Sequence, residues 1–443
     1  MKTSFPGRVF FRESGWYSLV PYAILLATFL AVSNINLKKG YKDGSMEADG
    51  KGYYAYLPAL FIYHDLSFRF YYPIERVTYS NPRLYYIYLR EINGKTINKY
   101  YAGTALCMMP FFALGHITTL VLGYPADGYS YYYMVWVHLG ALFYLLLGLL
   151  SLRRLLRTFD IPEKWIAVTL VTIVFGTNLF YYTLTEYSMS HIYSFTAITC
   201  FLLATRHYFL HKEGRALVLA GLILGIIVLI RPVNAIILLS IPFIAGSRNT
   251  FYAGLKKLPG HIKFLLPAFL VFTFIASLQL VIYKIQTGHF LVYSYPGEGF
   301  DFLHPHFTDM LISYRKGLFV YTPIYLLSLS GFIFLWKQNR YAAISMAGFL
   351  VLLTYMFSSW IMWYYGGSFS QRVFVDYLAF FAILIALSLK QFSSGWVRNA
   401  YLSITFILVL LCQLQTYQYR HMVIHWSEMT KEMYRENFWK LNP

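Results

Sequence analysis

Two acidic residues stand next to apolar segments, where a carboxylate can act on a substrate at a membrane surface. Asp49 lies in the run Ala-Asp-Gly-Lys-Gly-Tyr-Tyr-Ala-Tyr-Leu-Pro, and Glu186 lies between two apolar segments further along the chain. Such a carboxylate could take the proton of an acceptor hydroxyl, and an ionisable group near a membrane is costly unless solvated or paired. A structural alternative stays open, because Asp49 could cap a helix beginning near Lys51 and Glu186 one beginning near Ser188.

Four basic residues lie on the side of the membrane that the predicted topology assigns to the outside: Arg231, Arg315, Lys316 and Arg372. This placement runs against the usual excess of Lys and Arg in inner loops, so we expect an anion to hold them. A guanidinium grips phosphate oxygens bidentately, which makes a lipid-linked phosphate the natural partner. The alternative is an internal salt bridge, such as Arg372 with Asp376 at the helical spacing i,i+4.

Aromatic and polar residues cluster in the same outer regions. Trp and Tyr around the Gly366-Gly367 turn offer flat apolar faces suited to sugar rings or a prenyl chain. For the histidine that follows Glu186, a hydrogen bond within the helix bundle is the competing interpretation. The residues predicted to line a substrate site are Tyr53, Tyr54, Lys99, His191, Tyr295, Glu298, His304, Trp363, Tyr364, Tyr365 and Gln371.

The sequence predicts no metal site and no required cofactor. His304-Pro305-His306 has no further Cys or His at a ligand spacing to complete a zinc site. Acidic groups in the same region could hold a divalent cation through oxygen ligands, and that option stays open. There is no phosphate-binding P-loop, no dinucleotide glycine fingerprint and no Gly-x-Ser-x-Gly elbow.

The composition is that of a membrane protein. The chain has 443 residues, of which 58% are hydrophobic and 13% charged, and 20% are aromatic. A soluble domain of this size needs more charge to cover its surface, and apolar runs of about 20 residues recur along the whole length. The net charge of +18 does not indicate nucleic-acid binding, because the basic residues punctuate the apolar runs instead of forming a tract.

The pattern predicts an all-α, polytopic bundle of about eleven transmembrane helices in a single unit, residues 1–443. The first apolar run, Trp16 to Val32, has no cleavage site and is interpreted as an anchor with a cytoplasmic N-terminus. Gly221 and Gly225 are spaced for close helix contact. The predicted spans are 17–36, 130–152, 165–183, 187–208, 216–230, 233–246, 263–285, 317–336, 341–359, 372–390 and 397–417.

The charge bias decides how the apolar segment 101–122 is placed. If it crossed the membrane, the next helix would deliver Arg153, Arg154 and Arg157 to the outside, so we predict that 101–122 lies along the outer surface. The outer regions are then a loop over 37–129 with amphipathic surface helices, two loops over 286–316 and 360–371, and a tail over 418–443. The tail could cover the site or lie on the membrane surface. The predicted location is the cytoplasmic (inner) membrane.

This layout resembles the GT-C superfamily of membrane glycosyltransferases, whose members include protein O-mannosyltransferases and the bacterial aminoarabinose and RgtA/B/C/D-like transferases. The resemblance is carried by Asp49 in its Gly- and Tyr-rich run, by the outer segment Lys99-Tyr100-Tyr101-Ala102-Gly103, by the span ending in Arg153-Arg154 and by Glu186 at the next outer turn. It covers most of the chain as architecture. One departure is Gly50 after Asp49, where the mannosyltransferases have an Asp-Glu pair, so protein O-mannosylation is not the expected activity.

The resemblance implies a transferase that takes sugar from a polyprenyl-phosphate donor and passes it to a hydroxyl of a lipid, glycan or protein acceptor. It implies that Asp49 is the base or acceptor binder, with Glu186 as the second acidic group. It also implies that Arg315, Lys316 and Arg372 hold the donor phosphate. Two rivals remain: a transporter or flippase for a lipid-linked sugar, and an oligosaccharide ligase or polymerase. The absence of repeated halves disfavours the transporter.

Overall fold

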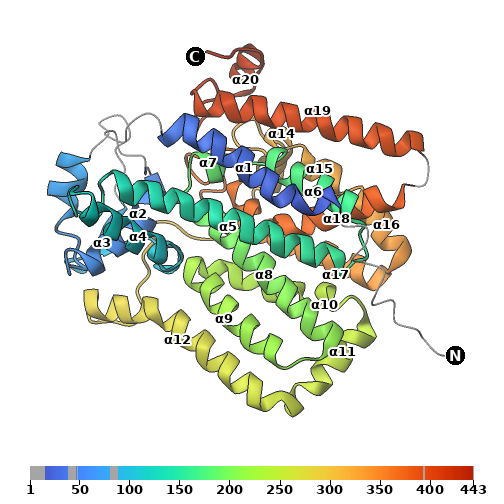
Figure 1. Ribbon diagram of the computed structural model, residues 1–443, viewed down its shortest axis with the longest axis horizontal. Coiled ribbons are helices and arrows are strands. Elements are labelled where there is room, and N and C mark those ends of the chain that lie inside the picture. The colour runs from blue at the N-terminus through green and yellow to red at the C-terminus, as the bar shows by residue number, and fades with distance from the viewer. Residues whose placement is uncertain (1–14, 38–45, 47, 80–87, 393–394, 443) are drawn as a thin grey trace.

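The computed structural model describes residues 15–37, 46, 48–79, 88–392 and 395–442, and almost all regular structure in them is helical (Figure 1). This agrees with the predicted all-α bundle. The longer helices are α1 (Val20–Val32), α4 (Gly103–Val121), α5 (Tyr131–Arg157), α6 (Glu163–Phe175), α8 (Ser190–His211), α9 (Arg215–Ile230), α12 (Ile262–Thr287), α17 (Arg340–Ser358), α18 (Leu378–Gln391) and α19 (Gly395–Arg420).

Short helices and turns fill the connections between the long ones. The short α-helices are α2 (Ala48–Tyr54), α3 (Tyr56–Phe61), α7 (Leu179–Leu184), α10 (Ile241–Ala245), α11 (Arg248–Lys257), α13 (Phe307–Ile312), α14 (Leu318–Tyr321), α15 (Ile324–Ser328), α16 (Gly331–Gln338) and α20 (Lys431–Asn437). Tighter or wider helical turns are η1 (Trp16–Leu19), η2 (Ser33–Leu37), η4 (Tyr71–Thr78), η5 (Pro232–Ser240), η6 (Pro259–His261) and η7 (Arg372–Tyr377).

Seven helical stretches among the described residues are long and apolar enough to cross a bilayer. They are 16–37, 103–121, 131–157, 259–287, 340–358, 372–391 and 395–420. Shorter apolar helices occupy 215–230, 232–245 and 324–338, so the total of about eleven spans stays a prediction. The surface placement of 101–122 also stays a prediction, because α4 has the length and composition of a span.

Two helices show the contrast between the lipid-facing and central positions of the bundle. In α12, only 17% of the most apolar window is buried, and Phe269 and Phe274 are exposed. In the stretch that contains α18, 94% of the window is buried. An exposed apolar helix of this length needs lipid around it, whereas α18 is covered by its neighbours on every side. Gly221 and Gly225 of α9 let it approach α12 closely, as predicted.

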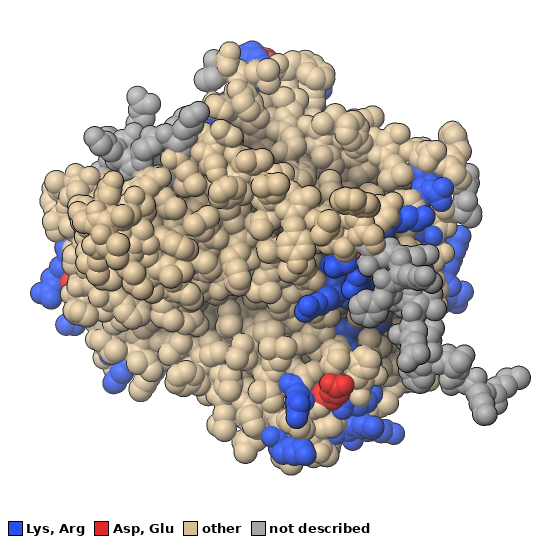
Figure 2. All heavy atoms as spheres, viewed as in Figure 1, with Lys and Arg blue, Asp and Glu red and all other residues tan. Residues whose placement is uncertain are grey.

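Charged side chains are unevenly spread over the face of the molecule seen in Figure 2. In Figure 1, α1, α5, α12 and α19 run in broadly the same direction, and α2, α3 and the end of α12 gather at the left. Figure 2 shows most of the Lys and Arg of this face over the right and lower right, where α11 lies, with a charge-free band across the middle. Which end faces the cytoplasm stays a prediction.

The structure corrects two helices that the sequence predicted as continuous. The span over 165–183 is broken, because α6 ends at Phe175 and α7 begins at Leu179. The span over 317–336 is divided into α14, α15 and α16, with Pro323, which has no N–H to donate, just before α15. After α9 the helical path is interrupted, since Arg231 is extended (φ −151°, ψ 108°) and Pro232 opens η5.

The segment predicted as the first outer loop contains a β-hairpin that was not predicted from the sequence. Strands β1 (Leu89–Ile92) and β2 (Lys95–Asn98) pair antiparallel, with Ile92 opposite Lys95. Their two-residue turn, Asn93-Gly94, has positive φ at both positions (51° and 71°). This is the turn that Asn-Gly favours, because it matches the twist of the strands. The hairpin ends at Asn98, immediately before Lys99.

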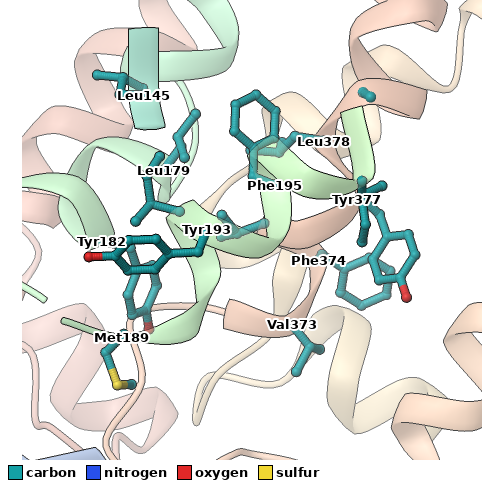
Figure 3. Close-up of a cluster of buried hydrophobic side chains, with 14 of the residues drawn as sticks. Leu145, Leu179, Tyr182, Met189, Tyr193, Phe195, Val373, Phe374, Tyr377 and Leu378 are labelled. Atoms are coloured by element: carbon teal, nitrogen blue, oxygen red, sulfur yellow. The ribbon is translucent and has the colours of Figure 1, made fainter. Parts of the chain in front are cut away.

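The central core lies against η7 and the start of α18. Figure 3 shows Leu145 of α5, Tyr182 of α7, Phe195 of α8 and Phe374 of η7 converging in one buried cluster. Their side chains are at most 1% exposed. Because this packing fixes η7 against α8 and the start of α18, the polar side chains of η7 have defined positions.

Candidate active site

Asp49 of α2 and Arg372 of η7 form an ion pair. Arg372 Nη2 donates to Asp49 Oδ2 at 2.7 Å, and the hydroxyl of Tyr100 donates to Asp49 Oδ1 at 2.6 Å. Both charged side chains are 14% exposed. Among the described residues the Asp49 carboxylate caps no helix, and Arg372 pairs with Asp49 instead of Asp376.

The glycines around Asp49 bring α2 close to its neighbours. A Cβ at Gly50 would lie 2.1 Å from Ser188 Oγ, and one at Gly52 would lie 2.4 Å from the ring of Tyr100. Asn98 fixes the same segment, since its amide donates to the Gly52 carbonyl at 2.6 Å. The two glycines of Asp-Gly-Lys-Gly therefore let α2 pack closely against Ser188 and Tyr100. Larger residues at these two positions would push α2, and with it the Asp49 carboxylate, out of place.

The electrostatics keep Asp49 ionised. Burial by itself raises the pKa of Asp49, but the charge of Arg372, the hydrogen bonds from Tyr100 and Arg372, and the charge of Lys99 outweigh it. The net pKa lies below its usual value. Asp49 is thus a carboxylate at neutral pH, and its basicity is held down while Arg372 is its partner.

A second carboxylate, Asp376, is fully buried behind Arg372. Its Oδ1 lies 2.9 Å from His191 Nδ1, while Oδ2 accepts from Asn234 at 2.9 Å and from Arg231 Nη1 at 3.3 Å. The hydroxyl of Tyr377 donates to Asn234 at 3.0 Å. For His191 the structure therefore favours the hydrogen-bonded interpretation. Arg231 bonds to Asp376 and also lies within electrostatic reach of Arg372.

Lys316 is a buried cation, 1% exposed, whose ammonium bonds to main-chain oxygens. It donates to the carbonyl of Ser368 and, at 2.6 Å, to that of Trp426, and it lies 4.9 Å from the centre of the Tyr419 ring. In the described part of the chain no carboxylate forms a salt bridge with it. Burial and the charges of Arg372 and Arg315 lower its pKa to about 7.

The tail covers this part of the site. Arg315 Nε donates to the Ser427 carbonyl at 3.2 Å, and its Nη2 lies 3.3 Å from Glu428 Oε1. The Arg315 guanidinium also stacks 3.5 Å from the centre of the Tyr364 ring. Of the two arrangements that the sequence left open for the tail, the structure shows contact with the candidate phosphate-binding cations.

Lys99 extends the site on the other side of Asp49. It forms an ion pair with Glu298 and lies 4.8 Å from the centre of the Tyr295 ring. The rings of Tyr53 and Tyr100 are 4.6 Å apart, and Tyr100 also meets Tyr295 at 6.3 Å. Aromatic faces thus line the approach to Asp49 from the first outer loop and from the loop after α12.

Glu186 lies at the edge of this cluster, between α7 and α8. It is half-buried, and its Oε1 is 3.4 Å from the hydroxyl of Tyr181. The charges of Glu186 and Arg372 both act electrostatically on Tyr182 and Tyr419. The two charged residues therefore lie near the same tyrosines. The structure thus places Glu186 beside the tyrosines that surround Arg372.

The remaining predicted residues are distributed around the site. Gln371 is fully buried, and within the described residues neither of its side-chain polar atoms has a hydrogen-bond partner. Tyr365 has a left-handed backbone (φ 54°) and lies near Arg231 and Arg372. Tyr54 instead donates to the Gly128 carbonyl inside the first outer loop. Trp363 is buried and stacks on His306.

The histidines of the loop after α12 bond locally. His304 is 79% exposed and bonds to Asp301 at 2.9 Å, and His306 bonds to Asp309 at 3.0 Å. Across the described ranges, no three His, Cys, Asp or Glu side chains gather in a way that could hold a metal ion. A divalent cation remains a prediction from the sequence alone.

Sequence reasoning missed three residues of this cluster. Tyr100 bonds directly to Asp49, and Asn234 donates to Asp376. Asp376 itself was considered only as a possible salt-bridge partner of Arg372. A signal existed for Asp376, since an acidic residue at the start of an apolar span needs a buried partner. Nothing in the sequence marks Tyr100 as a partner of Asp49, because it is one of 42 tyrosines.

No family model matches the chain, and no curated protein matches it. Among solved structures, it is similar to the Archaeoglobus fulgidus oligosaccharyltransferase in the apo form, with 13% identity over 97% of this chain and 61% of that chain, and a TM-score of 0.49. It is also similar to AglB of the same organism with an inhibitory peptide and a dolichol-phosphate, at 12% identity, 97% and 60% coverage and a TM-score of 0.44.

A third structure, the same organism's enzyme tethered to an acceptor peptide with the NVT sequon, gives 12% identity, 96% and 59% coverage and a TM-score of 0.43. This chain thus spans about three fifths of the length of these proteins. Oligosaccharyltransferases are glycosyltransferases, the class that the sequence resembles. At these scores the likeness is descriptive, and the functional proposal rests on the contacts within this chain.

Proposed function

We propose that this protein is a membrane glycosyltransferase that moves a sugar from a polyprenyl-phosphate donor to an acceptor hydroxyl at the outer face of the cytoplasmic membrane. The observation that carries the proposal is the placement of Lys316, a buried ammonium without a carboxylate partner among the described residues, within electrostatic reach of Arg372, which pairs with Asp49. A buried cation is costly to keep, and an anionic group of the substrate would offset that cost.

The proposed division of labour follows the charges. Arg372 and Lys316 bind the phosphate of the donor, and Arg315 adds a third cation next to Lys316. Asp49 faces the acceptor, next to Tyr53 and to the Tyr100 hydroxyl that bonds to it. Cations placed at the leaving phosphate stabilise the charge that develops on it in the transition state, and a carboxylate at the acceptor takes its proton.

The chemical step is a single displacement. The acceptor oxygen attacks the anomeric carbon of the sugar, and the bond between that carbon and the phosphate oxygen breaks with its electron pair left on the phosphate. The hydroxyl proton passes to Asp49 and then to solvent. The products are the glycosylated acceptor, a polyprenyl phosphate monoester and a proton. One displacement inverts the anomeric configuration.

The ion pair gives the donor a role in activating the base. While Arg372 holds Asp49, the pKa of Asp49 lies below its usual value. A donor phosphate that attracts the Arg372 guanidinium weakens this pair, so the pKa of Asp49 rises and the carboxylate becomes a stronger base. Binding of the donor then precedes activation of the acceptor, which protects the donor from unproductive hydrolysis.

A labelled donor tests the proposal. Membranes or nanodiscs that contain the protein are supplied with polyprenyl phosphate carrying one radiolabelled sugar, and the transfer of label to endogenous or added acceptors is measured. We expect Asp49→Asn to lose transfer by at least about 100-fold. Asp309→Asn is the matched control, because Asp309 is exposed in another outer loop, and it should keep the wild-type rate.

The assay also separates the rival activities. A transporter would move the labelled lipid across the bilayer without releasing sugar from phosphate. A ligase or polymerase would transfer label only from a donor that carries an oligosaccharide. Either result, or full transfer by Asp49→Asn, contradicts the proposal.

A further inference from the structure

Five buried or nearly buried charged side chains form one connected group behind the acceptor side of the site. Arg372 bonds to Asp49, Arg231 bonds to Asp376, and the two arginines are within electrostatic reach of each other and of Tyr53. Lys316 also feels the charge of Arg372. The group contains three cations and two carboxylates, and Glu186 lies at its edge.

Asp376 is the member furthest from solvent, with an exposed fraction of 0%. Its two oxygens are used by His191, Asn234 and Arg231, so they do not face a substrate. It follows Arg372 by one turn of η7. In a poorly polarisable interior, however, its charge acts beyond its hydrogen-bond partners. Asp376 therefore reduces the positive potential at the candidate phosphate position without touching it.

The proposed reaction makes this potential important. The donor contains a phosphodiester, which carries one negative charge. The product is a phosphate monoester, whose second pKa lies near 6, so it carries about 1.5 to 2 negative charges at neutral pH. Every additional positive charge at the site therefore favours the product over the donor. A site with too much positive charge would retain the polyprenyl phosphate and turn over slowly.

We infer that Asp376 is a positioning residue that holds Arg231 in place and sets the positive charge of the site, so that the phosphodiester donor can compete with the phosphate monoester product. The inference rests on the proposed function and deepens it, because it assigns control of product release to the buried pair Asp376–Arg231. A purely structural ion pair would influence folding without changing the preference between two phosphates.

Binding of two simple lipids tests the charge effect. Purified protein in nanodiscs is titrated with a polyprenyl monophosphate and with the methyl diester of the same lipid phosphate, and the ratio of the two dissociation constants is measured. For Asp376→Asn we expect the preference for the monoester to increase about three- to ten-fold, from the Coulomb attraction of one uncompensated charge.

Two further variants keep the test decisive. Arg231→Gln leaves Asp376 without its cation, so the ratio should move in the opposite direction, towards the diester. The double variant Asp376→Asn, Arg231→Gln removes one charge of each sign and should return the ratio to near the wild-type value. Rescue by the double variant is not expected from a structural role, because it removes the ion pair completely. If Asp376→Asn does not fold, Arg231→Gln alone still gives a signed result.

The outcomes separate this inference from the proposed function. If the wild type binds neither lipid, both are overturned. If it binds both lipids but Asp376→Asn leaves the ratio unchanged, or the double variant keeps the shift of the single one, only the charge-setting role is overturned. Turnover gives a corroborating measurement: Asp376→Asn should lower kcat in steady state more than the single-turnover rate, because product release becomes slower.

Discussion

The guanidinium of Arg372 donates to the carboxylate of Asp49 at 2.7 Å and so joins the first outer loop to the start of the most buried helix of the bundle. The two residues are 323 positions apart. Each keeps a second contact, Asp49 with Tyr100 and Arg372 with the sulfur of Met189. This pair brings a candidate base and a candidate phosphate ligand into direct contact.

Replacing Arg372 tests both halves of that relationship. Arg372→Gln removes a cation from the leaving phosphate, and we expect kcat/KM for transfer to fall by about 10²- to 10³-fold. It also leaves Asp49 buried without its main counter-charge, so the pKa of Asp49 rises and the acidic limb of the rate profile moves to higher pH. The measurement is the initial transfer rate as a function of pH. Arg340→Gln, at the exposed start of α17, should change neither quantity.

Lys316 should set the alkaline limb of kcat/KM. Its pKa is lowered to about 7, so the ammonium carries its charge below that pH and loses it above. Because only the charged form attracts the donor phosphate, kcat/KM should decline as pH rises through about 7. Lys316→Arg stays protonated throughout this range and should move the decline to higher pH. An alkaline limb at the same pH in both proteins would exclude Lys316 as its source.

Glu75 makes the stability of the first outer loop depend on pH. Burial raises its pKa to about 7, in spite of the hydrogen bonds from Tyr129 and Tyr88. A carboxyl whose pKa is raised on folding contributes stability that is fully present below the unfolded pKa, near 4.5, and is lost as pH rises to about 7. The loss amounts to about 3 kcal/mol at most. Thermal unfolding of the purified protein should therefore move to lower temperature over this interval.

The matched variants for this effect are Glu75→Gln and Glu91→Gln. The first cannot ionise and should remove most of the dependence of the melting temperature on pH between 4.5 and 7. Glu91 is exposed on β1, so its replacement should leave the dependence intact. Equal slopes for the wild type and Glu75→Gln would refute the assignment.

Gln418 fixes the tail that covers Arg315 and Lys316. Its buried amide donates to the carbonyls of Asn437 at 3.1 Å, Phe438 at 2.8 Å and Lys440 at 2.9 Å. Gln418→Ala removes the two N–H donors that these three carbonyls share, and each donor contributes about 1 kcal/mol. We expect trypsin to cleave at Lys431 or Arg435 about ten-fold faster in this variant. Gln338→Ala, at an exposed helix end, is the control and should be cleaved at the wild-type rate.

The membrane architecture and most of the polar cluster could be predicted from the sequence. Hydropathy predicts the long apolar helices, because a segment in lipid must be apolar and must satisfy its own backbone hydrogen bonds. The positions of the basic residues predict which loops share one side of the membrane. Asp49, Arg372, Lys99, Arg231 and Lys316 were selected as charged residues near apolar segments. The structure pairs Asp49 with Arg372, and Lys99, Arg231 and Lys316 lie within electrostatic reach of one member of that pair.

The partners within the cluster could not be predicted, because pairing depends on packing between distant segments. Arg372 had Asp376 available one turn away, but η7 directs the two side chains to different neighbours. Tyr54 and His304 have suitable chemistry and still point into other contacts. The breaks at Gly176 and Pro323 were missed because apolar runs hide short interruptions. The Asn93-Gly94 hairpin had a recognisable turn signal that was not used.

The most direct test of the account separates donor binding from chemistry in Asp49→Asn. Binding of a polyprenyl phosphate sugar to purified protein is measured together with the single-turnover rate of sugar transfer. We predict that Asp49→Asn binds the donor at least as tightly as the wild type, because Arg372 is released for the phosphate, and that its transfer rate falls by at least about 100-fold. Transfer at the wild-type rate by a folded Asp49→Asn protein would contradict the account.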